Sequence, residues 1–492
     1  MDILTNTISL LFRPRQKEIA RFAQDADAIQ HKQLKSLLST ARNTEWGLKH
    51  DYKSIQGYAD FCERIPLQTY DDIKPYATRM INGERKILWP SVVRWYAKSS
   101  GTTNDKSKFL PVTPEILKGC HYKGGFDTVS IYLQNNPDSH FFASKGLILG
   151  GSHSPSPLNR NAHCGDLSAV LLQNLNPLVN LIRVPDKKII LMDEWESKIK
   201  AIVESTWKTD VNSLSGVPSW MLVLIKAVLQ KTGSEYLTDV WPNMEVFFHG
   251  GISFEPYRDQ YKALIPSDRM HYMETYNASE GFFGLQDNPE EHSLLLMIDY
   301  SVFYEFIPIN EVGEEHPTVL PLEAVEVGKN YAMVITTSGG LWRYQIGDTV
   351  RFTSLYPHKF VISGRTKNFI NAFGEELMVD NADKAISRVC RQTGAKVKEY
   401  TAAPLFMLDK AKGRHQWMIE FEKMPPSLDD FASLLDKTLQ QLNSDYEAKR
   451  YKEISLQPLE IRVAREGTFY EWLRRKGKLG GQHKIPRLSN DR

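Results

Sequence analysis

The chain has 492 residues, of which 41% are hydrophobic and 24% are charged, as is ordinary for a soluble globular protein. Its 61 Lys and Arg residues balance 59 Asp and Glu residues, so no global field favours nucleic acid or a membrane as a partner. No apolar run reaches the ~20 residues that span a bilayer, and the N-terminus lacks the basic start of a secretory signal. The four cysteines are scattered, which indicates reduced thiols. We expect a cytoplasmic monomer of two or three domains, with neither nucleic acid nor membrane as partner.

The first third of the chain begins with a helical region that runs to about residue 85, where apolar residues recur at helical spacing. An apolar segment follows, then a short polar loop, then a second apolar segment, as in a hairpin. Thr113 and Pro114 next resemble the start of a capped helix. Helices are predicted over 15–28, 31–40 and 115–134, and strands over 87–96 and 109–112.

The middle of the chain alternates helices with apolar strands that end in small polar residues. This alternation predicts an α/β domain with its site at the strand ends. Strands are dense from 290 to 365, which predicts an added antiparallel or barrel-like part. Strands are predicted over 146–151, 245–251, 270–280, 294–298, 304–308, 330–337 and 342–352, and helices over 190–232 with a break at 213–220.

A boundary is predicted near 364–368, because a different pattern of strands and helices follows it. The fold class is therefore α/β, with a large N-terminal domain over 1–365 and a small, mobile α+β domain over 366–492. The C-terminal stretch 477–487 is rich in glycine and basic residues, as expected of a flexible segment that seeks anions.

The most informative stretch is the loop of the predicted hairpin, from Ser99 to Thr103. It contains four hydroxyls around Gly101, with Lys98 and Lys106 nearby. Glycine lets the backbone approach a ligand closely, and successive N–H groups can form a nest that binds phosphate. An ordinary loop is the alternative. The chain contains neither a Walker loop nor a Gly-x-Gly-x-x-Gly fingerprint after a strand.

Three later segments could complement a phosphate loop. Tyr276 to Gly281 offers an aromatic ring, a hydroxyl and the Glu280 carboxylate, which is the kind of hard oxygen ligand that Mg²⁺ prefers. Asp348 follows a glycine at a strand end and could accept bonds from ribose hydroxyls. Lys484 lies in the basic tail and could bring a cation to a phosphate. Taken singly, these residues could equally be a core tyrosine, a surface acid, a turn residue and a solvated charge.

A metal site was also considered around His153, His163 and Cys164, which lie in a stretch rich in Ser, Pro and Asn. Their spacing fits no zinc pattern. We therefore expect no metal there.

The order of these segments resembles the Gretchen Hagen 3 family of acyl-acid amido synthetases, which belongs to the adenylate-forming, acyl-CoA synthetase-like superfamily. The resemblance rests on SSGTT, then Tyr-x-x-Ser-Glu-Gly, then Arg-Tyr-x-x-Gly-Asp, and it spans nearly the whole chain. The segment 364–370 resembles the superfamily hinge, and 482–487 resembles the family's C-terminal lysine segment. Asn104 and Asp105 stand where many relatives carry glycine.

The resemblance implies a role for each matched position. ATP would be bound through its triphosphate, adenine, α-phosphate and ribose, with Mg²⁺ on Glu280. Two lysines would contact the nucleotide or the acyl phosphate in one or other position of the small domain. The implied ATP-binding residues are Ser99, Ser100, Gly101, Thr102, Thr103, Gly250, Gly251, Tyr276, Ser279 and Asp348, and the implied catalytic residues are Lys484, Glu280 and Lys367.

The implied reaction is ATP-dependent activation of a small carboxylic acid to an acyl-adenylate, followed by transfer to the amino group of an amino acid. Indole-acetate, jasmonate-like and benzoate-type acids all remain open as substrates. A CoA-type ligase with a thiol acceptor and a catalytically silent nucleotide-binding protein are the alternatives. The acyl group is expected in an apolar slot beside the loop, lined by Tyr122, Phe126, Ser130, Val217 and Trp220, although for at least half of these residues core packing is favoured over a role in the slot.

Overall fold

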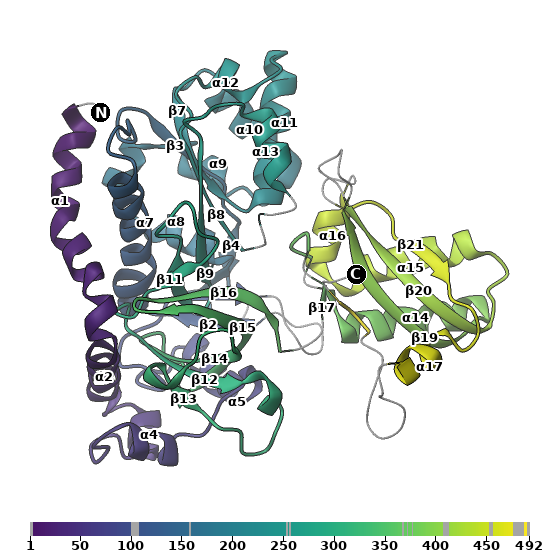
Figure 1. Cartoon of the computed structure of the whole chain (residues 1–492), viewed down its shortest axis with the longest axis horizontal. Coiled ribbons are helices and arrows are strands. Elements are labelled where there is room, and N and C mark those ends of the chain that lie inside the picture. The colour runs from purple at the N-terminus through teal and green to yellow at the C-terminus, as the bar shows by residue number, and fades with distance from the viewer. Residues whose placement is uncertain are drawn as a thin grey trace.

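The computed structural model of the chain has a large α/β part and a smaller α+β domain, joined near residues 366–377 (Figure 1). This arrangement confirms the predicted fold class. The predicted boundary between 365 and 366 stays a prediction. No described helix is long and apolar enough to cross a membrane. The structure describes residues 3–99, 108–156, 159–251, 254, 257–366, 369–370, 372–375, 377–406, 413–451, 456–475 and 487–489.

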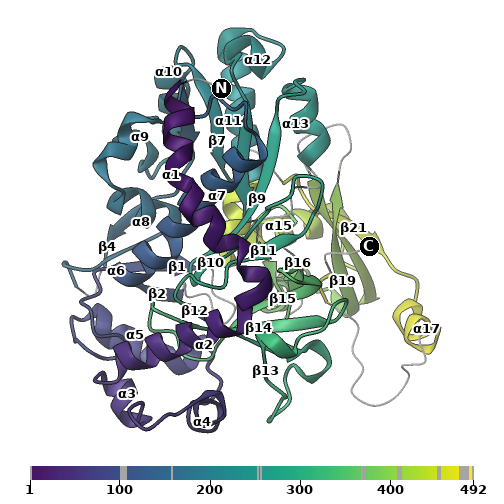
Figure 2. The same cartoon turned by 60° about the vertical axis from the view of Figure 1, so that its left-hand side comes forward.

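The N-terminal region is helical, as predicted, and α1 runs along the outside of the large part (Figure 2). α5 begins with a capping box, in which the backbone N–H of Thr69 donates to Asp72 Oδ2 at 2.7 Å. The helices are α1 (Ile3–Ala20), α2 (Phe22–Ala41), α3 (Glu45–Lys49), α4 (Tyr58–Arg64) and α5 (Tyr70–Ile81).

A twelve-stranded sheet forms the centre of the large part, in the order β13-β12-β14-β15-β16-β11-β10-β9-β8-β7-β3-β6. From β6 to β9 neighbouring strands are parallel, and from β9 onward they are antiparallel. The predicted antiparallel part therefore continues the same sheet. The strands are β3 (Lys145–Ile148), β6 (Arg183–Val184), β7 (Val211–Gly216), β8 (Val246–Gly250), β9 (His271–Ala278), β10 (Gly281–Leu285), β11 (Leu294–Leu296), β12 (Val302–Pro308), β13 (Leu320–Pro321), β14 (Asn330–Thr337), β15 (Tyr344–Leu355) and β16 (His358–Arg365).

Two predictions of local structure are corrected by the structure. The helices are interrupted around 213–220 as predicted, but the interruption contains most of β7, an unpredicted interior strand between β3 and β8. Its polar Ser213 is accommodated because Gly146 of β3 lies opposite, and a Cβ there would come within 2.9 Å of Ser213 Oγ. The strand predicted from residue 87 begins only at Trp95, because the preceding segment buries Trp89 beside Trp342, with ring centroids 6.2 Å apart.

Helices cover both faces of the parallel strands, and two adjacent phenylalanines of β8 show how. The ring of Phe247 stacks on Tyr261 of α13, with centroids 5.0 Å apart. The ring of Phe248 contacts Tyr132 of α7 on the other face, with centroids 5.7 Å apart. Because successive strand residues point to opposite faces, α7 lies on one face and α13 on the other. The helices are α6 (Pro114–Ile116), α7 (Tyr122–Asn135), α8 (Leu167–Asn174), α9 (Lys187–Ile190), α10 (Trp195–Thr206), α11 (Pro218–Thr232), α12 (Leu237–Val240) and α13 (Arg258–Leu264).

A second, four-stranded sheet carries the predicted hairpin, in the order β2-β1-β5-β4. β1 pairs antiparallel with β2 and parallel with β5. The C-terminal ends of β1 and β5 therefore lie at the same end of this sheet. The strands are β1 (Trp95–Ser99), β2 (Lys108–Val112), β4 (His153–Pro155) and β5 (His163–Gly165).

The small domain packs helices on a three-stranded sheet around Trp417, which is completely buried. Its partners include Tyr400, whose ring stacks on Trp417 with centroids 5.4 Å apart. The elements are β17 (Phe369–Ile370), β18 (Leu377–Met378), α14 (Val379–Thr393), β19 (Lys396–Phe406), β20 (Gly413–Lys423), α15 (Leu428–Leu442), α16 (Ser444–Arg450), β21 (Glu460–Val463) and α17 (Thr468–Arg475).

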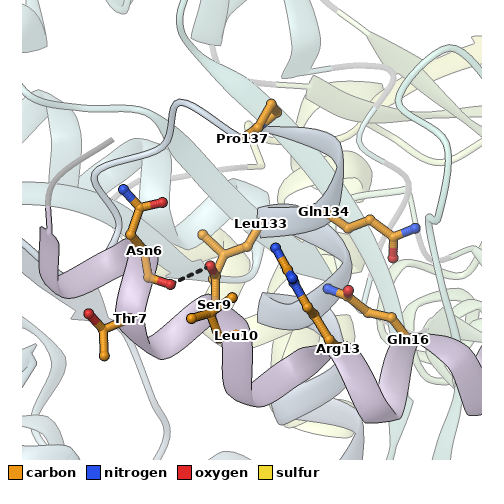
Figure 3. A pocket seen from close by; sticks show the side chains of 9 residues that line it. All are labelled: Asn6, Thr7, Ser9, Leu10, Arg13, Gln16, Leu133, Gln134 and Pro137. Atoms are coloured by element: carbon orange, nitrogen blue, oxygen red, sulfur yellow. Dashed lines mark hydrogen bonds between the residues drawn. The ribbon is translucent and has the colours of Figure 1, made fainter.

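A cavity of about 440 Å³ lies between α1 and α7, remote from the strand ends (Figure 3). Residues of α1 such as Leu10 and Arg13 line one side, and Leu133 of α7 lines the other. Its lining includes no residue that the sequence predicts for the site.

Close contact between α7 and β10 predicts a test of packing. A Cβ on Gly124 would lie 2.4 Å from the ring of Phe282, whereas a Cβ on the adjacent Gly125 meets no atom within 4 Å. We expect Gly124→Ala to lower the free energy of unfolding by about 1–3 kcal/mol through overpacking. Gly125→Ala should raise it slightly because alanine favours a helix. Urea unfolding of both variants checks this, and equal stability would contradict the packing.

Candidate active site

The candidate site lies where the parallel strands β3, β7, β8 and β9 end at a common edge, because parallel strands all point the same way. Glycine lies at or near three of these strand ends: Gly150 two residues after β3, Gly216 at the end of β7 and Gly250 at the end of β8. Lys198 of α10 stabilises this edge, since its Nζ donates to the backbone O of Gly150 at 3.1 Å. Burial lowers the pKa of Lys198, while Asp166 and Asp193 oppose that shift.

Gly250 and Gly251 both require glycine. A Cβ on Gly250 would lie 2.3 Å from the backbone O of Thr275 on β9. Gly251 has φ of +84°, in the region that favours glycine. The end of β8 therefore has two consecutive positions without a side chain, where the sequence predicts the adenine contact.

The polar loop is anchored at both of its ends. Ser99 pairs with Lys108 across the hairpin, and Lys108 Nζ lies 5.7 Å from the centroid of the Tyr70 ring. Tyr70 also accepts a hydrogen bond from the backbone N–H of Phe109 at 2.8 Å. The predicted positions Ser100, Gly101, Thr102, Thr103, Lys367 and Lys484 lie outside the described residues, as does the side chain of Ser99.

Ser279 and Glu280 form the two-residue turn between β9 and β10, directly after the pair of Ala278 and Gly281. Glu280 is 6% exposed. The turn is the continuation of β9, so it leaves the same sheet edge as Gly250. The structure thus brings a carboxylate and a hydroxyl to the edge where the sequence predicts the nucleotide.

Tyr276 and Asp348 are far apart in sequence but are hydrogen-bonded to each other: the Tyr276 hydroxyl donates to Asp348 Oδ2. The Tyr276 ring also packs against Phe283 and Phe360, with centroids 5.1 and 6.1 Å away. These contacts account for a buried tyrosine without a ligand, so its stacking on adenine stays a prediction. Asp348 pairs with Arg365 at the last rung of β15 and β16, beside the junction to the small domain.

The five residues predicted for the acyl slot lie in different places. Tyr122 faces α8, since its hydroxyl donates to the backbone O of Leu171 at 2.9 Å. Phe126 faces α1 instead, is 45% exposed, and its ring centroid lies 4.5 Å from that of Phe12. Ser130 is buried on the same helix. Val217 lies beside Gly251, where a Cβ on the glycine would come within 3.5 Å of Val217 Cγ2.

Trp220 is on α11, on the opposite face of the sheet from α7, and contacts the small domain. Lys449 of α16 lies 4.3 Å from the centroid of a Trp220 ring. Burial raises the pKa of Asp445, also on α16, while Lys449 opposes that shift. The charges of Lys98 on β1 and of Asp166 after β5 also act on that pKa. Sequence reasoning missed this contact, because no local pattern marks it.

Two histidines near the site, His249 and His121, are buried. Burial lowers the pKa of His249 to about 3, with Arg258 contributing, and its ring stacks on Phe254 at 4.2 Å between centroids. Burial lowers the pKa of His121 to about 4. Among the described residues there is no group of three or more His, Cys, Asp or Glu that could hold a metal ion.

The pKa of His249 predicts how stability depends on pH. Its pKa is lower in the folded protein than the ordinary value of about 6.5, so the unfolded chain binds the proton more readily. Its neutral form therefore favours folding fully above that value, and this contribution is lost as pH falls toward 3. We expect His249→Gln to lose about 2 kcal/mol less stability than the wild type between pH 7.5 and pH 5. Urea unfolding at both pH values checks this, and parallel losses would contradict it.

Comparison with known proteins covers nearly the whole chain. Models of the GH3 family N-terminal, central and C-terminal domains match residues 15–270, 295–365 and 380–492. The indole-3-acetic acid-amido synthetase GH3.4 of Arabidopsis thaliana is 26% identical, over 96% of this chain and 90% of the relative. These matches confirm the resemblance drawn from the three sequence segments.

Solved structures agree on the fold. The AtGH3.15 acyl acid amido synthetase in complex with 2,4-DB has a TM-score of 0.62 at 18% identity, over 97% of this chain and 94% of that chain. A 2-hydroxyisobutyryl-CoA ligase has a TM-score of 0.57 at 12% identity, over 95% of this chain and 90% of that chain. Because the three domain models together match most of the chain, the chain belongs to the GH3 family.

Proposed function

We propose that this protein is an ATP-dependent ligase that activates a small carboxylic acid as an acyl-adenylate and transfers the acyl group to the amino group of an amino acid. The observation that carries the proposal is the hydrogen bond between Tyr276 and Asp348. It joins two of the three family segments near the ends of the strands. The glycine pair at the end of β8 and the turn with Glu280 leave the same edge. Relatives that match nearly the whole chain are acid-amido synthetases.

The reaction needs no nucleophilic side chain. The substrate carboxylate attacks the α-phosphorus of ATP and expels pyrophosphate, and the amine then attacks the acyl carbon and expels AMP. The protein has to hold the reactants in line and stabilise charge as it develops. We assign the triphosphate to the loop from Ser99 to Thr103, the ribose to Asp348, and the acyl phosphate to Lys484 and Lys367 in turn as the small domain changes position.

The residues fit a magnesium ion held mainly by substrate. Mg²⁺ binds through one or two carboxylates and completes its shell with water and phosphates. Glu280 supplies one carboxylate at the strand edge, and Ser279 beside it can donate to a phosphate. When bound, the ion neutralises charge on the phosphates. Burial of Glu280 makes its carboxylate a fixed rather than a mobile ligand.

Trapping the adenylate tests the proposal. The purified protein is incubated with ATP, Mg²⁺, hydroxylamine and a panel of indole-acetate, jasmonate-like, benzoate-type and short hydroxy acids. Hydroxamate that forms only with a particular acid, with equal pyrophosphate, is the expected result. No hydroxamate with any acid would favour the silent nucleotide-binding alternative.

The acceptor is tested separately. With the active acid fixed, AMP release is measured with each amino acid and with CoA, and the product mass is determined. We expect an amide with one or a few amino acids and no thioester. Thioester formation would instead identify a CoA ligase, whose fold this chain shares.

A further inference from the structure

A π-turn at the start of α7 contacts the strands that carry Ser279 and Glu280. Residues Leu117–His121 form it, and the backbone N–H of Tyr122 donates to the O of Leu117, five residues back. Such turns inside helices are frequent at functional sites because they redirect side chains. Here the turn brings two consecutive side chains, Cys120 and His121, against the β9–β10 hairpin.

Cys120 and His121 each form a hydrogen bond with one residue of the same cross-strand pair, Asn277 and Phe282. The backbone N–H of Phe282 on β10 donates to Cys120 Sγ at 3.1 Å. His121 Nδ1 lies 2.9 Å from Asn277 Oδ1 on β9. Asn277 and Phe282 face each other in the ladder, one pair before the turn and directly beside a bulge. Backbone pairing is disrupted at a bulge. The hydrogen bonds from the π-turn to Asn277 and Phe282 therefore help to fix the position of the turn between β9 and β10.

The hydrogen bond to Asn277 fixes the tautomer of His121. An amide oxygen only accepts, so Nδ1 carries the proton and Nε2 is an acceptor. Burial lowers the pKa of His121 to about 4, so the ring is neutral at pH 7. Nε2 is buried and bonds to no other described residue.

We propose that His121 is a positioning residue, which acts through Asn277 to hold Ser279 and Glu280 in the geometry that the adenylating site requires. The expected effect on the rate of adenylate formation rests on the proposed function. The expected effect on the β9–β10 turn does not. His121 touches neither acid nor nucleotide in this assignment. Its loss should therefore alter the rate of adenylate formation and the Mg²⁺ requirement, with the KM for the acid nearly unchanged.

Two amide variants separate the two ring nitrogens. In His121→Asn the amide nitrogen takes the place of Nδ1 and can still donate to Asn277, whereas in His121→Gln it takes the place of Nε2. We expect His121→Asn to retain nearly the wild-type rate of hydroxamate formation. We expect His121→Gln to lose about 10- to 100-fold, the range for residues that orient a metal ligand, and to require more Mg²⁺.

His50 provides a matched control, because its Nδ1 also bonds an oxygen, Arg64 O at 2.9 Å, and its Nε2 is also buried without a described partner. It lies just after α3, remote from the hairpin. His50→Gln should change thermal stability alone. If both His121 variants lose hydroxamate rate only in proportion to their loss of thermal stability, the positioning role is wrong. If His121→Gln is active and His121→Asn is not, Nε2 contacts a ligand and the proposal is overturned.

Hydrogen exchange gives a readout that does not depend on activity. Peptides that cover 275–285 should exchange faster in His121→Gln than in His121→Asn or the wild type. Unchanged exchange in His121→Gln overturns the positioning role even in an active enzyme. A wild type that makes no hydroxamate with any acid refutes the proposed function, while the exchange result still decides whether His121 holds the hairpin.

Discussion

Glu280→Ala is expected to lower the rate of acid-dependent pyrophosphate release by about 10²–10³-fold while ATP binding weakens far less. The reason is that the carboxylate stabilises charge on phosphates that are leaving, and removing one such fixed contact typically has an effect of this order. Glu280 is 6% exposed and lies in a two-residue turn, so its carboxylate is held in place. Pyrophosphate release is measured under saturating acid, and ATP affinity by calorimetry. Lys484→Ala should have a similar effect.

The control for Glu280→Ala is another partly buried carboxylate of the same sheet. Glu245 precedes β8 at the opposite edge and accepts from Ser139 Oγ at 2.9 Å. Glu245→Gln removes a charge without approaching the site, so its pyrophosphate release should match the wild type. Glu280→Gln keeps the side-chain shape and should behave as Glu280→Ala does. A near-normal rate in both Glu280 variants would remove Glu280 from the site and weaken the whole assignment.

The candidate site could be predicted from residue types whose local requirements are visible in the sequence. Gly250 has to be glycine because a Cβ would meet Thr275, so its requirement appears in the chain itself. Asp348 follows Gly347, whose φ of +91° favours glycine. Gly347 lies inside β15 rather than at a strand end, where the register with β14 shifts. The strand predicted over 330–337 has the observed bounds of β14, and all of its residues but the first are buried. Fold class and motif order could therefore be inferred from residue types and spacing.

Long-range partners could not be inferred in the same way. The sequence gives no sign that Trp220 meets Lys449, because a tryptophan followed by an apolar helix is typical of any core. β7 was missed since its polar face is set by Gly146 on a neighbouring strand, and pattern alone cannot reveal that neighbour. The sequence predicts that His121 belongs to an ordinary helix over 115–134. The π-turn in the structure instead directs its side chain at Asn277. In each case the decisive partner lies on another element.

Arg343→Met is expected to lower the free energy of unfolding by about 3–5 kcal/mol, the range for removing one partner of a buried ion pair. Arg343 NH2 lies 3.0 Å from Glu305 Oε1, and the two side chains are 5% and 0% exposed. Arg343 also donates to the backbone O of Cys62 and Ile65, which ties the N-terminal helices to the start of β15. Urea unfolding followed by tryptophan fluorescence measures the loss. Arg79→Met, which breaks exposed pairs with Glu45 and Glu84, should change little.

The penalty in Arg343→Met arises from the carboxylate left behind, and two further observations should show this. Replacing both partners, as Arg343→Met with Glu305→Leu, should recover most of the stability, because no buried charge remains. Burial already raises the pKa of Glu305, and Arg343 opposes that shift. Without Arg343 the pKa rises further, so the folded state takes up a proton more readily than the unfolded state as pH falls. The single variant should therefore be less destabilised at pH 5 than at pH 8, and a loss independent of pH would assign the effect to the broken backbone contacts instead.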